Sequence, residues 1–82
     1  MADVKGTNGD DTLNALGLGD VFYGYGGNDV INGSSGNDTM YGGADNDTLY
    51  GSFGNDSLDV GAGDDSIYGG VGNDIIYGLI YI

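Results

Sequence analysis

The chain has 82 residues and a mass of 8.3 kDa, which suffices for one small domain. It contains no His, Cys or Glu, and Lys5 is its one basic residue, so imidazole bases, thiolate nucleophiles and arginine clamps are absent and the composition argues against an enzyme. The net charge of -12 repels phosphate backbones and anionic lipid, which excludes nucleic acid and membrane surfaces as partners and favours cations. Without disulfides, so small a core needs another source of stability.

The predicted elements form one uninterrupted series, so we expect residues 1–82 to be a single domain. Residues 1–5 predict a partial N-terminal strand with Val4 inward. A nine-residue repeat then runs over residues 6–77 and residues 78–82 follow as an apolar C-terminal strand or cap. The eight units of the repeat begin at Gly6, Ala15, Gly24, Gly33, Gly42, Gly51, Val60 and Gly69.

Two positions of this repeat are chemically constant. Position six is always aspartate: Asp11, Asp20, Asp29, Asp38, Asp47, Asp56, Asp65 and Asp74. Position eight is always apolar: Leu13, Phe22, Ile31, Met40, Leu49, Leu58, Ile67 and Ile76. The regularity indicates a stacked-repeat architecture.

Within each unit the residues predict a turn followed by a short strand. Gly occupies position one in six units and position four in six, and Asn or Asp occupies position five in seven. Because these residues accept positive φ at little steric cost, we expect left-handed backbone at these positions. Positions seven to nine, as in Val30-Ile31-Asn32, predict a three-residue strand with its middle side chain inward.

Such units cannot bury a core alone and must stack, which predicts an all-β parallel β-solenoid. The smallest closed coil has two strands facing each other, so two nine-residue repeats form one coil and eight units form about four coils. Odd and even units then lie on opposite sides. Each edge of the stack carries a column of four carboxylates.

These columns predict calcium sites. Neighbouring coils are about 4.8 Å apart, so a cation midway between them lies about 2.4 Å from oxygens on each, within the range for calcium and beyond that for magnesium. Carboxylates and turn carbonyls supply only hard oxygen ligands, which disfavours zinc and copper. Three gaps on each edge give about six Ca2+ sites, whose charge would balance that of the chain.

Units such as Gly33-Ser34-Ser35-Gly36-Asn37-Asp38-Thr39-Met40-Tyr41 resemble the nonapeptide G-G-x-G-x-D-x-U-x of the RTX (hemolysin-type) calcium-binding family. The resemblance implies a right-handed parallel β-roll that binds calcium between successive turns, with the eight phased aspartates as ligands. It also implies bacterial secretion to an extracellular location, although residues 1–10 lack the features of a cleavable signal peptide. The turn-glycine carbonyls that it assigns to the calcium shell are those of Gly9, Gly27, Gly36, Gly54, Gly63 and Gly72.

Two units depart from that pattern, and neither a toxin nor a hydrolase activity is carried over from the family. The unit at 15–23 lacks Gly at positions one and four, and Asp45 replaces Gly at position four of the unit at 42–50. The sites that touch these units are therefore the weakest assignments.

Two alternatives remain beside this interpretation, and a third is excluded. The aspartate columns could be a solvated acidic face, whereas an EF-hand is excluded because the chain has no Glu for the bidentate ligand. Outward tyrosines at position nine predict a cross-strand aromatic ladder or, alternatively, a binding surface.

The ends of the solenoid lack the polar caps that usually protect open edges. The strand at residues 3–5 continues the pattern at one end, and the apolar residues 79–82 form an adhesive strand at the other. This predicts either a calcium-dependent head-to-tail filament or a monomer whose C-terminal residues fold back as a lid.

Overall fold

The computed structural model describes residues 3–17 and 19–78, and this part of the chain is all-β. It forms strands of three residues each, separated by turns. Their bounds are Asp3–Lys5 (β1), Thr12–Asn14 (β2), Val21–Tyr23 (β3), Val30–Asn32 (β4), Thr39–Tyr41 (β5), Thr48–Tyr50 (β6), Ser57–Asp59 (β7), Ser66–Tyr68 (β8) and Ile75–Tyr77 (β9). The expected strands, including the partial strand before the first unit, are confirmed. No helix in the described ranges is long and apolar enough to cross a membrane.

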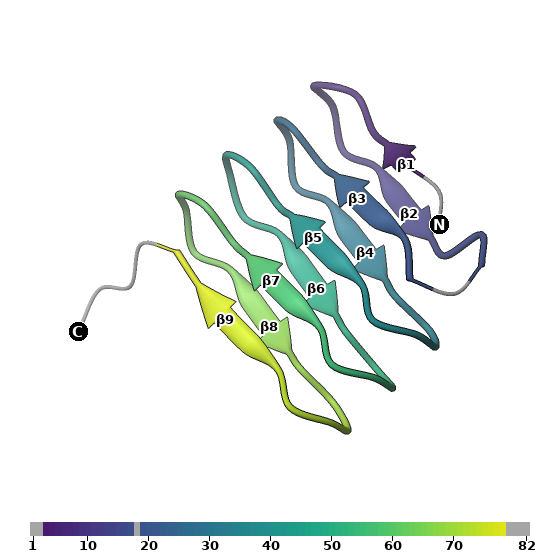
Figure 1. The fold of residues 1–82 in the computed structure, drawn as a ribbon. Helices are drawn as coiled ribbons and strands as arrows, with labels where there is room; N and C mark the ends of the chain where they lie inside the picture. The colour runs from purple at the N-terminus through teal and green to yellow at the C-terminus, as the bar shows by residue number, and fades with distance from the viewer. Residues whose placement is uncertain (1–2, 18, 79–82) are drawn as a thin grey trace.

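The strands form two parallel sheets that face each other, with the orders β1-β3-β5-β7-β9 and β2-β4-β6-β8 (Figure 1). Each strand pairs with the equivalent strand two units later, so that Phe22 lies opposite Met40 and Ile31 opposite Leu49. The fold is therefore the predicted parallel β-solenoid of about four turns, with two units in each coil. This register places every unit directly above the unit 18 residues before it.

The core is a single row of position-eight side chains between the two sheets. Its buried members are Leu13, Phe22, Ile31, Met40, Leu49 and Leu58, with Val60 beside them. Burial of one such side chain stabilises the fold by about 1.5–3 kcal/mol. The row weakens toward the C-terminal end, where Ile67 is half-buried and Ile76 is 43% exposed.

The turns differ from the expectation in where their left-handed residues lie. In the units from residue 24 onward, positive φ occurs at positions two and four, as at Ser34 (68°) and Gly36 (92°). The prediction was right for position four and wrong for position one and for the Asn and Asp residues of position five. The physical reason is that position-one glycines serve close approach between coils, and position-five side chains bond to the neighbouring coil, as described below.

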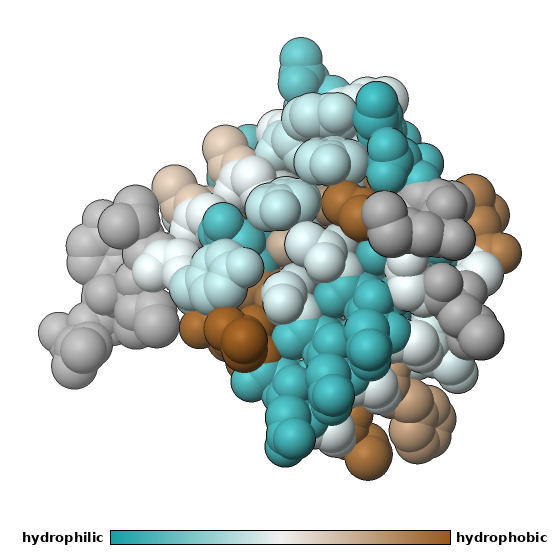
Figure 2. Space-filling view, in the orientation of Figure 1, coloured by the Kyte–Doolittle hydropathy of each residue, from teal (hydrophilic) through white to brown (hydrophobic). Residues whose placement is uncertain are grey.

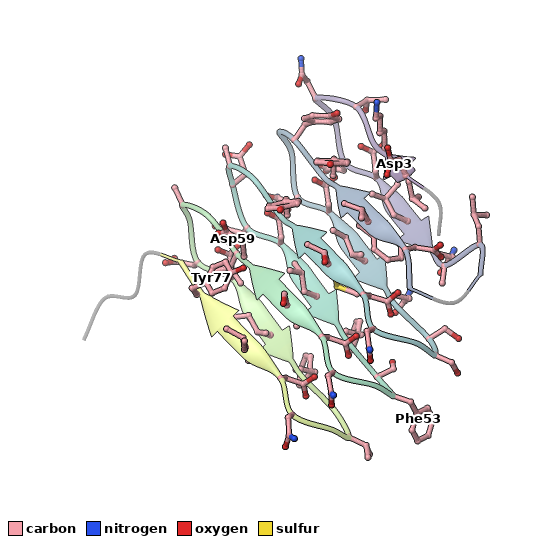
Figure 3. The ribbon with its side chains drawn as sticks, viewed as in Figure 1. Asp3, Phe53, Asp59 and Tyr77 are labelled. Carbon is pink, nitrogen blue, oxygen red and sulfur yellow. The ribbon has the colours of Figure 1, made fainter. Side chains whose placement is uncertain are left out.

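The outer faces of the sheets carry the predicted aromatic ladder. The rings of Tyr23 and Tyr41 stack with centroids 5.3 Å apart, and those of Tyr50 and Tyr68 stack at 4.9 Å. Where β7 lies beside β9, the ladder has Asp59 next to Tyr77 (Figure 3). These side chains support the pairing of strands across coils.

The two ends of the stack expose different strands. β1 and β2 lie at one end and β8 and β9 at the other (Figure 1). In β9, Ile75 is 59% and Tyr77 46% exposed. The space-filling view shows hydrophobic residues as separate spots, one of them at the β9 end (Figure 2). Of the expected C-terminal strand or cap, residues 79–82 lie outside the described residues.

Candidate metal centre

Each phased aspartate comes immediately before a strand, so strand pairing aligns the aspartates. Because β4 pairs with β6, Asp29 and Asp47 lie one coil apart on the same edge. One edge of the stack carries Asp11, Asp29, Asp47 and Asp65, and the other carries Asp20, Asp38, Asp56 and Asp74. The structure thus brings all eight predicted aspartates into the two expected columns.

These carboxylates are buried far more deeply than acidic side chains usually are. Asp29, Asp38 and Asp47 are each 1% exposed, and Asp20 and Asp56 are equally inaccessible. Isolated buried carboxylates are strongly destabilising unless they are paired or bind a metal. Because Lys5 is the one basic side chain, the chain cannot neutralise the columns itself. This burial also rules against the interpretation of a solvated acidic face.

One oxygen of each inner carboxylate joins two coils. The backbone N–H of each aspartate donates to Oδ1 of the aspartate one coil later, at 2.8–2.9 Å. In this way Asp38 N–H bonds to Asp56 Oδ1, and Asp38 Oδ1 accepts from Asp20 N–H. The bonds bridge all six gaps between the phased aspartates, and they fix the direction of each carboxylate.

The second oxygen, Oδ2, distinguishes two groups of aspartates. It is buried and has no hydrogen-bond partner in five of them, which are Asp29, Asp38, Asp47, Asp56 and Asp65. In the first two units it is satisfied by its own turn: Asp11 Oδ2 accepts from Thr7 N–H at 2.6 Å, and Asp20 Oδ2 accepts from Leu16 and Gly17 N–H at 2.9 Å. Unpaired oxygens on buried carboxylates indicate a missing cationic partner.

Position-one carbonyls of the next coil converge on these unpaired oxygens. A Cβ placed on Gly24 would lie 2.7 Å from Asp29 Oδ2 and 2.6 Å from the Gly42 carbonyl oxygen. The same pair recurs at Gly51, 2.6 Å from Asp56 Oδ2 and 2.7 Å from the carbonyl oxygen of the next unit. Position one is glycine because a side chain would fill this oxygen-lined space.

The glycine carbonyls named from the sequence also lie in the gaps between coils. At position four, the Gly9 carbonyl faces the α-carbon of Gly27, and the Gly36 carbonyl faces that of Gly54. Gly63 and Gly72 lie in the same way above the position-four carbonyls of the coils before them. Among the described residues, neither these carbonyls nor the position-one carbonyls accept any of the backbone hydrogen bonds that join turns of successive coils.

The electrostatics of the columns follow from their burial. Burial, with a smaller contribution from neighbouring carboxylates, raises the pKa of Asp38 to about 6 and that of Asp47 to about 7, against the lowering effect of the backbone N–H bonds. Burial likewise raises the pKa of Asp29, Asp56 and Asp65. Each column therefore holds negative charge at an energetic cost that a bound cation would remove.

The donor set of these gaps fits calcium. Within residues 3–17 and 19–78 no three His, Cys, Asp or Glu side chains lie close enough to hold a metal by themselves, so backbone carbonyls have to complete the shell. Carboxylates from successive coils together with peptide carbonyls form an all-oxygen set, as calcium prefers. Soft-ligand metals have no suitable donor here.

Comparison with known proteins agrees with this chemistry. The family described as RTX calcium-binding nonapeptide repeat matches the chain at residues 17–49 and 50–79, with four copies of the repeat. The match covers more than half of the chain, and the protein belongs to this calcium-binding repeat family. A search of curated proteins finds no match.

Sequence reasoning missed a second ladder at position five. The backbone N–H groups of five position-five residues donate to the side-chain Oδ1 one coil earlier, at 2.7–2.9 Å, as from Asn46 to Asn28, whereas Asn37 lies above Gly19, which has no side chain. This ladder runs opposite to the Asp ladder. The recurrence of Asn or Asp beside each phased aspartate was the available signal, and it was taken for a turn preference.

Proposed function

We propose that the protein is a non-enzymatic, extracellular structural module that folds when it binds Ca2+ between its stacked Gly/Asp turns. The observation that carries this proposal is the row of buried Oδ2 atoms without partners, four of which, in Asp29, Asp38, Asp47 and Asp56, lie beside a carbonyl of the next coil. Oxygens of Asp29, Asp38, Asp47 and Asp56 would hold the ions of the inner gaps, with position-one and position-four carbonyls. About six ions in one chain remains our prediction.

Calcium would couple directly to folding. Because the two oxygens of each gap come from coils 18 residues apart, the unfolded chain holds no preformed site. Each ion at ten times its dissociation constant stabilises the folded state by about 1.4 kcal/mol. Several such ions match the typical net stability of a whole domain, about 5–15 kcal/mol. The calcium-free chain, with its charge of -12, is then mostly disordered.

An extracellular location is consistent with the calcium affinity that we expect and with the family. Calcium modules outside cells use dissociation constants of about 0.1–1 mM, which would leave the chain empty at cytosolic calcium levels. The high negative charge supports cations as partners and opposes binding to nucleic acid or anionic membranes.

Circular dichroism during a calcium titration tests the proposal. We expect a disordered spectrum in chelator, a β-rich spectrum with a midpoint near 0.1–1 mM, and a much weaker response to magnesium. A chain that is fully folded in excess chelator, or that responds equally to magnesium, would refute it.

A second candidate function is assembly into a calcium-dependent head-to-tail filament. The observation that favours it is that both ends of the solenoid carry unpaired strand edges, with Ile75 and Tyr77 largely exposed at the end formed by β8 and β9.

A further inference from the structure

The two ends of the solenoid are complementary in topology. At the N-terminal end, β1 is the edge of one sheet and β2 the edge of the other, and at the C-terminal end the edges are β9 and β8. Among the described residues, every inner strand has a partner on both sides, whereas these four have a partner on one side only. The backbone groups along four edges are therefore available for pairing.

The inward side chains at the two ends are also incompletely covered. At the C-terminal end Ile76 is 43% exposed and Ile67 is half-buried, and at the N-terminal end Val4 is half-buried. These residues occupy the same position-eight row as the buried core. The core row therefore ends in a partly exposed apolar side chain at each end of the solenoid. Another apolar side chain placed next in the row would cover it.

We propose that a second copy of this chain docks head to tail so that its β1 pairs with β8 and its β2 pairs with β9. The inference rests on the proposed function, because both surfaces exist only in the calcium-folded chain. This register extends each sheet by one strand of the next copy with no strand position left empty. Because residues 3–17 and 19–78 form nine strands, an odd number, each copy is turned by half a turn relative to the copy before it.

The contacts at this junction repeat those between coils inside one chain. Val4 of the next copy lies against Ile67, and Leu13 of the next copy lies against Ile76, which continues the core row. Lys5 of the next copy meets the face of Tyr68, where a cation–π contact forms. The single basic residue of the chain thus lies at the position where the aromatic ladder of β6 and β8 ends.

One aspartate column also continues through the junction. Asp74 is followed at one coil's distance by Asp11 of the next copy, in the same relation as Asp38 and Asp56 within the chain. Calcium at one of the two edges therefore strengthens the junction.

The alternative register, with β1 of the next copy against β9, is less favourable. It leaves a missing strand between β8 and β2 of the next copy, and so an unfilled place in the core row. The two registers differ in a measurable length. Half-turn stacking advances the next copy by four and a half coils, about 22 Å, whereas the alternative advances it by five coils, about 24 Å, without rotation.

Two charged variants test the docking in millimolar calcium. Val4→Asp blocks the N-terminal face and Ile76→Asp blocks the C-terminal face, while Phe53→Asp places the same charge on a turn residue that is 62% exposed and points away from the roll (Figure 3). We expect the unaltered chain and Phe53→Asp to form polymers in sedimentation. Each end variant should be a monomer, and an equal mixture of the two end variants should form a dimer, because each retains the face that the other lacks.

Circular dichroism of every sample separates assembly from folding. β-rich spectra with a monomeric unaltered chain would overturn the docking and leave calcium-dependent folding intact. A disordered spectrum in calcium would overturn the proposed function. Polymers of either end variant alone would overturn the head-to-tail arrangement, and an axial rise of about 24 Å without rotation in electron micrographs would overturn the half-turn register.

Discussion

The first coil and the inner coils contain the same phased aspartates but treat them differently. In the first coil, Asp11 and Asp20 direct Oδ2 to N–H groups of their own turns. In the inner coils, Oδ2 of residues such as Asp38 has no such donor and faces a carbonyl of the next coil. The turns therefore differ in how far they satisfy the phased carboxylate by themselves.

Backbone conformation accounts for this difference. From residue 24 onward the turns have positive φ at positions two and four, whereas Thr7, Gly9 and Leu16 of the first coil do not. The turns before Asp11 and Asp20 lack a left-handed residue at position two, although Gly19 has positive φ at position five, and their N–H groups bind the carboxylate. We therefore expect calcium to stabilise the inner coils more than the first coil.

The largest expected effect comes from removing an inner carboxylate. Asp38→Ala should destabilise the calcium-bound fold by about 3 kcal/mol, because it removes ligands from two gaps and leaves the buried Asp20 N–H without its acceptor. Asp74→Ala, which borders one gap, should cost less and Asp11→Ala least. Calcium midpoints from circular dichroism rank the three, and an equal shift for Asp11→Ala would contradict the distinction between coils.

Two glycines with different surroundings test the oxygen-lined space: Gly51 lies in it at position one, whereas Gly9 faces largely open space at position four of the first unit. Gly51→Ala should destabilise by about 2 kcal/mol, because its Cβ would lie 2.6 Å from Asp56 Oδ2 and 2.7 Å from a carbonyl oxygen. At Gly9 in the first coil the nearest such atom is Thr7 Oγ1 at 3.7 Å, so Gly9→Ala should be neutral or stabilise by up to about 1 kcal/mol. Thermal unfolding in calcium measures both, and comparable losses would show that the oxygens around position one do not determine the cost of adding a Cβ.

The pH dependence should change sign with calcium. Since the pKa of Asp38 is raised to about 6 and that of Asp47 to about 7, the calcium-free folded chain binds more protons than the unfolded chain, and its free energy of unfolding falls as pH rises. This loss begins near the ordinary value of 3.8 and is complete above about pH 7.

In calcium-depleted buffer we therefore expect structure to increase on acidification from pH 7.5 to 4, followed by circular dichroism. In excess calcium, acidification should decrease structure, because protons compete with the ion for the same oxygens. Asp47→Asn should weaken the calcium-free response and Asp11→Asn should not. A calcium-free chain that gains structure at higher pH would contradict the burial of these carboxylates.

The smallest expected effect concerns the turn backbone itself. Ser52 has φ 69°, so Ser52→Gly should relieve strain and stabilise by about 0.5 kcal/mol. Leu16→Gly in the first coil, where φ is not positive, should destabilise by a similar amount through the entropy of glycine. Denaturant unfolding in calcium measures the change in the free energy of unfolding for each variant. A change of the same sign at both positions would show that positive φ does not explain the difference between the turns.

The features of the fold that depend on the nine-residue period were predicted from the sequence. One inward apolar residue in every nine predicts the strands, their register and the core row from Leu13 to Leu58. One aspartate in every nine predicts the two columns of carboxylates in the same way. The turns were predicted less well, because glycine is compatible with several roles. Gly24 allows the next coil to approach closely, and Gly27 adopts positive φ. The sequence shows only a glycine at each position and cannot tell these two roles apart.

The hydrogen-bond ladder at position five was not predicted from the sequence for a related reason. Asn28 and Asn46 are typical turn residues, and only the coil spacing shows that each side chain bonds to a backbone 18 residues away. The unpaired Oδ2 atoms likewise depend on the φ values of particular turns. The hydrogen bonds and unpaired oxygens between coils can therefore be identified only from the three-dimensional arrangement of the coils.

The pairing of every strand with the strand 18 residues away has a mechanical consequence. Because β1 and β9 lie at opposite ends of the stack, a force applied to the two ends of the chain acts along the direction in which the coils are piled. Coils then detach one at a time from an end, and each releases about 60 Å of extended chain. The roll would yield as a series of equal steps and would shorten again, coil by coil, as calcium refills each gap.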